Sequence, residues 1–147
     1  MAPKPIAIAS DHAGFALKGV LIAELERLGR PALDLGTGSE DSVDYPDFGK
    51  SLALAIADGR AERGIVICGT GIGISIAANR NPAVRAAVCH DVTSTRLARE
   101  HNDANVLAMG ARLIGVEVAK DCLKVFLETA FAGARHARRV EKLGAGG

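Results

Sequence analysis

The chain has 147 residues, an ordinary hydrophobic content of 48%, and 18 Lys and Arg residues against 17 Asp and Glu residues. This length suits a single domain with a substantial core. A net charge of +1 and an aromatic content of 3% argue against nucleic-acid and membrane-surface partners, which usually require a basic excess or stacking rings. No apolar run predicts a membrane span, and the first residues do not resemble a secretion signal.

Short apolar runs alternate with longer amphipathic segments along the chain. In chain order, we expect a strand at 6–9, a helix at about 17–28, a strand at 32–35, a polar loop at 36–47, a helix at 48–58, a strand at 64–68, a helix at 74–79, a strand at 84–89, a helix at 92–100, a strand at 106–109, a helix at 115–131 and a short basic helix before a mobile tail at 144–147. This alternation predicts an α/β fold, a single three-layer α/β/α sandwich on a five-stranded parallel Rossmann-like sheet.

Parallel sheets of this kind bind ligands at the carboxyl ends of their strands. The most distinctive strand end is the turn that contains Gly69, Gly71 and Gly73. Glycines allow the backbone to approach a ligand, and the helix that follows adds the positive end of its dipole. The spacing matches neither the dinucleotide fingerprint nor a P-loop, so the turn is either a plain strand-to-helix connection or, as its many small residues favour, an anion-binding loop.

Cys68 ends the buried strand directly before this turn. A cysteine in such a strand is commonly a small core residue, but the amides of the turn would stabilise a thiolate here. Cys89 and Cys122 lack such a setting and are expected in the core. The odd number of cysteines, without a CxxC pair, favours reduced thiols in a cytoplasmic protein. No set of His, Cys, Asp or Glu residues has the spacing of a metal site.

Three further groups of polar residues have two interpretations each. Asp11 and His12 could bind hydroxyls and a phosphate or cap the following helix. The segment 101–103 could supply site residues or only terminate a helix. Arg135 and Arg139 share one helix face and could bind a phosphate, although an isolated basic cluster is more often a solvated surface.

Together, six motifs resemble the type B ribose-5-phosphate isomerases and the related galactose-6-phosphate isomerase subunits. They are Ser-Asp-His-Ala-Gly-Phe at 10–15, Asp-Tyr-Pro at 44–46, Cys-Gly-Thr-Gly-Ile-Gly-Ile-Ser-Ile-Ala-Ala-Asn at 68–79, His-Asn-Asp-Ala-Asn-Val-Leu at 101–107, Gly-Ala-Arg at 110–112 and Arg-His-Ala-Arg-Arg-Val at 135–140. The resemblance covers the chain from residue 6 to about residue 143. Ile74 stands where one branch of the family has a glutamate base, so the chain resembles the cysteine branch; Arg80 replaces a common lysine outside the proposed chemistry.

The resemblance implies an aldose–ketose isomerase that acts through an enediolate, with no metal or organic cofactor. It implies that Cys68 is the general base, that Thr70 assists proton exchange between the sugar oxygens, and that His101 assists opening of the furanose ring. The substrate-binding residues that it implies are Asp11, His12, Tyr45, Gly69, Gly71, Ile72, Gly73, Asn102, Arg112, Arg135 and Arg139. Among these, His12 and the three arginines are expected to bind the phosphate.

The resemblance also implies the strand order 2-1-3-5-4 and a homodimer, or a dimer of dimers, with sites that combine both subunits. His101, Asn102 and Arg112 are then expected from the partner. Two alternatives remain open: isomerisation of another sugar phosphate, such as allose 6-phosphate or galactose 6-phosphate, and a non-catalytic phosphosugar- or nucleotide-binding module. Retention of both Cys68 and His101 argues against the second.

Overall fold

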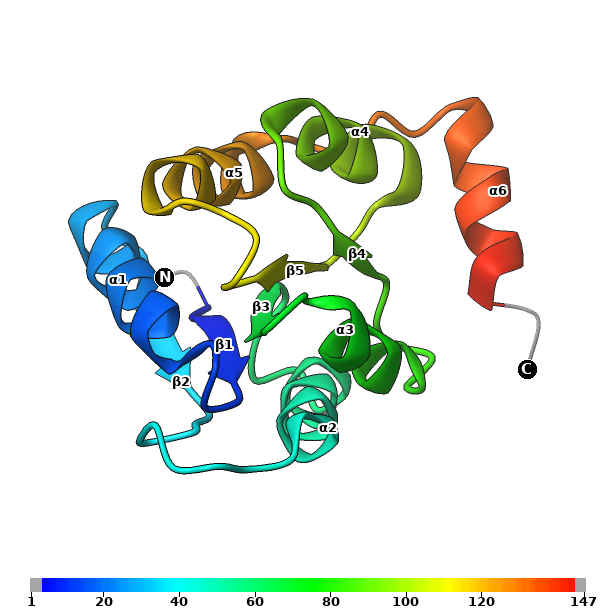
Figure 1. The fold of residues 1–147 in the computed structure, drawn as a ribbon. Coiled ribbons are helices and arrows are strands. Elements are labelled where there is room, and N and C mark those ends of the chain that lie inside the picture. Colours follow the sequence, from blue (N-terminus) through cyan, green and yellow to red (C-terminus); the bar gives the residue numbers. More distant parts are fainter. Residues whose placement is uncertain (1–3, 145–147) are drawn as a thin grey trace.

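A computed structural model of the chain describes residues 4–144 and contains five strands and six helices (Figure 1). In chain order these are β1 (Ile6–Ser10), α1 (Phe15–Arg27), β2 (Ala32–Asp34), α2 (Tyr45–Ala57), β3 (Gly64–Cys68), α3 (Ile72–Asn79), β4 (Ala86–Val88), α4 (Val92–Asn102), β5 (Val106–Gly110), α5 (Val116–Glu128) and α6 (Arg135–Gly144). Every helix in this described part of the chain is too short or too polar to cross a membrane.

The five strands form one parallel sheet in the order β2-β1-β3-β5-β4. The expected fold class and strand order are therefore confirmed. β3 lies at the centre, where Cys68 is directly opposite Gly110 of β5. This register places the end of β3 beside the end of β5, at the edge where parallel sheets bind ligands.

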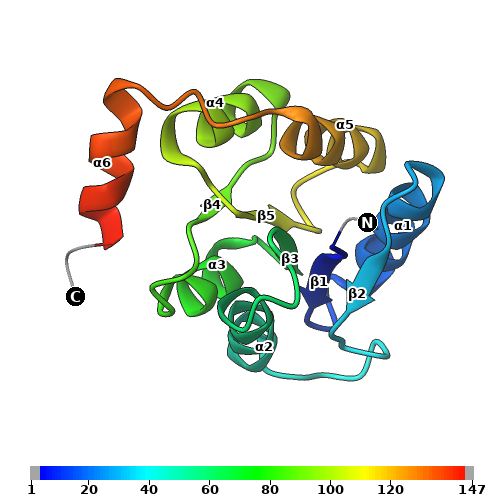
Figure 2. The ribbon, with the colours of Figure 1, turned by 180° about the vertical axis from the view of Figure 1, so that it is seen from behind.

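Helices cover both faces of the sheet, with α1, α4 and α5 on one face and α2 and α3 on the other (Figures 1 and 2). Alternate residues of β3 divide between the two layers. Ile65 and Ile67 belong to the core beneath α1 and α5, whereas Val66 and Cys68 belong to the core beneath α2 and α3. The thiol therefore lies on the side of the sheet that α2 and α3 cover.

Helices α2 and α3 begin earlier than the sequence suggested. α2 starts at Tyr45 instead of residue 48, because Pro46 in the first turn has no amide hydrogen to satisfy and already has a helical φ. α3 starts at Ile72 instead of residue 74, because Gly71 has a φ of 78° and turns the chain directly into the helix. Both differences bring the helix N-termini closer to the end of β3.

The second half of the chain differs in the same modest way. α4 continues to Asn102, so that His101 and Asn102 form its last turn and do not lie in a loop. α5 ends at Glu128, short of residue 131, because Thr129 is extended and donates its hydroxyl to the carbonyl of Val125 at 2.6 Å. Gly144 is the last residue of α6, and the remainder of the mobile tail expected at 144–147 lies outside the described part.

α6 stands apart from the two helical layers and lies beyond the β4 edge of the sheet, beside α4 (Figures 1 and 2). Its exposed residues include Arg135, Arg139 and Leu143. A helix held by so few neighbours contributes little to the core of its own chain.

The turn between β1 and α1 packs directly on β3. A methyl group added at Gly14 would lie 2.7 Å from both the carbonyl oxygen and Cγ2 of Ile67. We expect Gly14→Ala to lower the free energy of unfolding by about 1–3 kcal/mol, because a close-packed interior must shift to accept the methyl group.

Gly19→Ala is the matched control. Gly19 lies inside α1 with nothing within 4 Å of an added methyl group, so this change is expected to raise the free energy of unfolding by about 0.5–1 kcal/mol. Urea unfolding midpoints measure both effects. Equal effects of the two substitutions would contradict the tight packing of the first turn.

Candidate active site

A cavity of about 550 Å³ opens at the carboxyl ends of β1 and β3 and the N-terminal ends of α2 and α3. Its lining consists of Asp11, His12, Ala13, Tyr45, Cys68, Gly69, Thr70, Ile72, Gly73, Ile76 and Arg112. Apart from Ala13 and Ile76, every lining residue is one that the sequence selected. Segments that are far apart in the chain thus meet at one concave site, the usual place for a small ligand.

The thiol of Cys68 is buried at the end of β3 and accepts a hydrogen bond from the backbone amide of Gly71, with an N–S distance of 3.2 Å. Gly71 is the residue that caps the N-terminus of α3. The sulfur therefore receives both a directed N–H group and the positive end of a helix dipole. The thiol thus lies where a backbone donor and a helix N-terminus converge.

The glycine turn is held by close contact with β5. A methyl group at Gly71 would lie 2.7 Å from the carbonyl carbon of Met109, and one at Gly110 would lie 2.6 Å from the carbonyl oxygen of Thr70. Within the turn, the Thr70 hydroxyl oxygen accepts the amide of Ile72 at 3.2 Å. The Ile72 amide is thus used inside the turn, while the hydroxyl hydrogen of Thr70 can still be donated to a ligand.

Tyr45 closes the α2 side of the cavity. Its ring lies so close to Gly73 that a methyl group added there would be 2.6 Å from Cζ of the ring. Glycine at position 73 therefore lets the first turn of α2 pack against the first turn of α3. Ile74, which follows, is fully buried in the core and offers no base to the cavity.

Asp11 and His12 both line the cavity, and the side chain of each also accepts a backbone amide. One carboxylate oxygen of Asp11 accepts the amide of Gly14 at 3.1 Å, which closes the turn before α1, while the residue also lines the cavity. The Nδ1 atom of His12 accepts the amide of Val43 at 3.1 Å. This bond assigns the proton of the neutral ring to Nε2, which can donate to an anionic oxygen.

Arg112 lies in the same cavity of the same chain, so our expectation that the partner supplies it is wrong. Its backbone amide donates to the carbonyl of Gly69 at 3.1 Å, which continues the pairing of β3 with β5 past the end of the sheet. Its guanidinium then lies beside the glycine turn, 3.4 Å from where a methyl group at Gly69 would be. The cavity thus contains a permanent positive charge as well as the Cys68 thiol.

The remaining selected residues lie elsewhere. His101, Asn102 and Arg139 line a second pocket of about 250 Å³ between α4 and α6, together with His136, Val140 and Leu143. Arg135 is on the same helix and is exposed. In one chain, therefore, the four residues expected at the phosphate divide, with His12 and Arg112 in the first cavity and Arg135 and Arg139 on α6.

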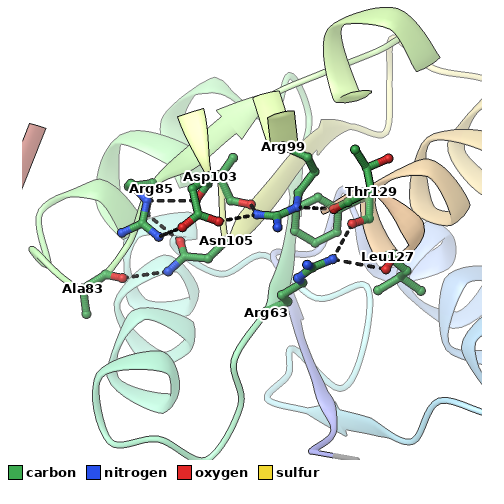
Figure 3. Close-up of polar contacts among 10 residues, drawn as sticks. Arg63, Ala83, Arg85, Arg99, Asp103, Asn105, Leu127 and Thr129 are labelled. Carbon is green, nitrogen blue, oxygen red and sulfur yellow. Dashed lines mark hydrogen bonds and ion pairs between the residues drawn. The ribbon is translucent and has the colours of Figure 1, made fainter. Parts of the chain in front are cut away.

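The end of α4 is fixed by a polar network that the sequence did not reveal (Figure 3). Asp103 has a left-handed backbone, with a φ of 46°, and terminates the helix. Its carboxylate accepts Nη1 of Arg99 at 2.9 Å, and its carbonyl accepts Nε of Arg85 at 2.8 Å (Figure 3). The helix-terminating interpretation is thus correct for Asp103, and the network fixes the turn that carries His101 and Asn102.

His136 is a second residue whose setting the sequence did not reveal. It is buried, and its ring stacks on that of His101, with the centroids 4.3 Å apart and the planes 15° apart. Its only signal was its position inside the basic motif at 135–140. In the described residues 4–144, no three His, Cys, Asp or Glu side chains lie together in a way that could hold a metal ion.

The family model described as Ribose/Galactose Isomerase matches residues 6–143. The chain belongs to this family. It is 46% identical to "Ribose-5-phosphate isomerase B" of Escherichia coli over 95% of the chain and 94% of that relative. It is 44% identical to "D-erythrulose-4-phosphate isomerase" of Pectobacterium atrosepticum over 95% of the chain and 92% of that relative.

The fold of this chain is closely similar to the solved structure of ribose-5-phosphate isomerase B from Clostridium thermocellum. The TM-score is 0.95 at 50% identity, over 96% of this chain and 95% of that one. The resemblance to type B ribose-5-phosphate isomerases is thereby confirmed.

The three cysteines differ in their settings, which predicts a difference in reactivity. Burial raises the pKa of the Cys89 and Cys122 thiols, and neither of these residues lines the cavity that contains Cys68. We expect iodoacetamide at neutral pH to alkylate Cys68 first, as peptide mass spectrometry would measure, because Cys68 lines the cavity whereas the raised pKa of Cys89 and Cys122 leaves little thiolate on either. Faster modification of Cys89 or Cys122 would contradict this difference in setting, and Cys68→Ser provides the unlabelled control.

Proposed function

We propose that the chain interconverts ribose 5-phosphate and ribulose 5-phosphate, with Cys68 as the general base at carbon 2 of the open-chain sugar. Membership of the family makes the chain an aldose–ketose isomerase. The observation that carries the proposal is the hydrogen bond from the Gly71 amide to the Cys68 sulfur at the floor of the cavity. Isomerisation needs one base beside a weakly acidic carbon and donors for the oxyanion that develops.

The surrounding residues support the same chemistry. The Cys68 thiolate takes the proton from carbon 2 and returns it to carbon 1, while the charge that develops on the carbonyl oxygen is stabilised by donors of the glycine turn. The hydroxyl of Thr70 is placed to exchange protons with the two sugar oxygens. His12 and Arg112 offer donors for the phosphate, which would orient the reacting carbons.

We further propose a homodimer in which each site receives His101, Asn102, Arg135 and Arg139 from the partner. Two observations support this arrangement. These residues lie apart from the Cys68 cavity in their own chain, on α4 and on the outlying α6. Exposed apolar side chains also border the cavity, since Ile72 and Ile76 are each 53% exposed and Tyr45 is 42% exposed. A second subunit would cover this apolar surface.

The three buried free cysteines also support the proposal of a cytoplasmic protein whose thiols remain reduced. The number of carbons in the sugar is the part of the specificity to be tested, because the Pectobacterium relative is named as an isomerase of a four-carbon sugar phosphate. Six-carbon sugar phosphates are the alternative substrates that are longer than ribose 5-phosphate. A pocket distinguishes substrates that differ by one carbon only weakly, so rates must be compared directly.

Activity on a panel of sugar phosphates tests the substrate and the base together. We expect the highest kcat/KM on ribose 5-phosphate, compared with allose 6-phosphate, galactose 6-phosphate and erythrulose 4-phosphate. Cys68→Ala and Cys68→Ser should each lose about 10²–10⁴-fold in kcat, since a positioned general base contributes that much. Cys89→Ala removes a thiol outside the cavity and should keep its activity. Near-normal isomerisation by Cys68→Ala would assign the proton transfer to another group.

Mixed subunits test the composite site. Cys68→Ala and His101→Ala should each be nearly inactive alone, but their refolded mixture should recover about one quarter of wild-type activity, because half of the dimers are mixed and each has one intact site. Sites built within single chains would give no recovery. Analytical ultracentrifugation of each variant checks that both remain dimers.

A further inference from the structure

We propose that His136 is a positioning residue, whose ring stacks on His101 and holds it as the proton donor that opens the furanose ring. This inference rests on the proposed function, in which His101 assists ring opening. It adds a residue to which neither the family resemblance nor the comparisons assign a role.

The geometry is that of two rings held face to face. The centroids of His101 and His136 are 4.3 Å apart, with an interplanar angle of 15°, and His136 is only 8% exposed. His101 belongs to the last turn of α4 and His136 to the first turn of α6. A ring that is covered on one face has fewer orientations available, which favours a single direction for its proton.

The segment between α5 and α6 is fastened to α4 on its way to this stack. Nε of Arg99 donates to the carbonyl of Thr129 at 3.0 Å, as Figure 3 shows, and the amide of Ala132 donates to the carbonyl of Glu100 at 3.1 Å. The amide of His136 then donates to the carbonyl of Gly133 at 3.0 Å as α6 begins. Hydrogen bonds from the α5–α6 segment to α4 therefore hold the backbone that carries His136 beside the backbone that carries His101.

Burial and the surrounding charges together favour the neutral form of His136. Burial is the main cause that lowers the pKa of His136, and the positive groups of His101, Arg135 and Arg139 lower it further, while Glu100 acts weakly in the opposite direction. A histidine normally takes up its proton near pH 6.5, so His136 does so only below that pH. A neutral His136 places no additional positive charge against the face of His101, which lies at the C-terminus of α4.

The role in ring opening can be separated from the role in enolisation. Ribose 5-phosphate is mainly a closed furanose, which must open before the proton at carbon 2 becomes acidic. Ribulose 5-phosphate carries its phosphate on the oxygen at carbon 5, so it cannot form a five-membered ring. Exchange of its carbon 1 proton with D2O therefore reports enolisation by Cys68 without any ring opening.

We expect His136→Ala to lower kcat/KM for ribose 5-phosphate by at least about 10-fold while the exchange rate on ribulose 5-phosphate stays near that of the wild type. His136→Phe restores a flat ring and should recover most of the lost rate. Arg138→Ala, an exposed change on the same helix, serves as the control and should alter neither rate. Equal losses in both assays would show a merely structural role, and unchanged rates in both would remove any role.

The pH profile gives a second readout. Acidification below the ordinary histidine range should protonate His136 in the wild type and slow the ribose 5-phosphate reaction more than the exchange reaction. His136→Phe cannot take up this proton and should lack the extra decline. Identical acid limbs in the two proteins would overturn the inference. An absence of ribose 5-phosphate isomerisation in the wild type would instead refute the proposed function on which it rests.

Discussion

The short turn that joins β3 to α3 is the constraint on which the candidate site depends. Gly71 adopts a left-handed conformation that points its amide back at the sulfur of Cys68, and this conformation is favourable for glycine. The turn cannot shift, because Gly71 and Gly110 leave no space between it and β5. Rigid packing thus keeps an N–H group and a helix N-terminus aimed at one thiol.

The other lining residues take their places relative to this turn. Gly73 admits the ring of Tyr45 from α2, and the pairing of β3 with β5 carries Arg112 to the carbonyl of Gly69. His12 follows the end of β1, and its ring is held by the hydrogen bond that it accepts from the Val43 amide. Preorganised donors of this kind need no rearrangement as charge develops, which is why such sites are built on strand ends and helix N-termini.

The sequence was sufficient for the architecture because the alternation of strands and helices is a local signal. It also selected most of the residues that line the candidate cavity, since glycines and polar residues directly follow β1 and β3. It did not place Arg112, because that position depends on the register of β3 with β5 across a long separation in sequence. Likewise, the stack of His136 on His101 depends on hydrogen bonds from Arg99 to Thr129 and from Ala132 to Glu100, which no local pattern encodes.

Proton transfer at carbon 2 is the central claim, and the fate of that hydrogen tests it most directly. Ribose 5-phosphate deuterated at carbon 2 can be followed by NMR as the label leaves that carbon, whether the label passes to carbon 1 or to solvent. The wild type should remove the label during turnover, whereas Cys68→Ala should remove it about 10²–10⁴-fold more slowly while it still binds the sugar phosphate. Loss of the label at the wild-type rate in Cys68→Ala would contradict the assignment of Cys68 as the base.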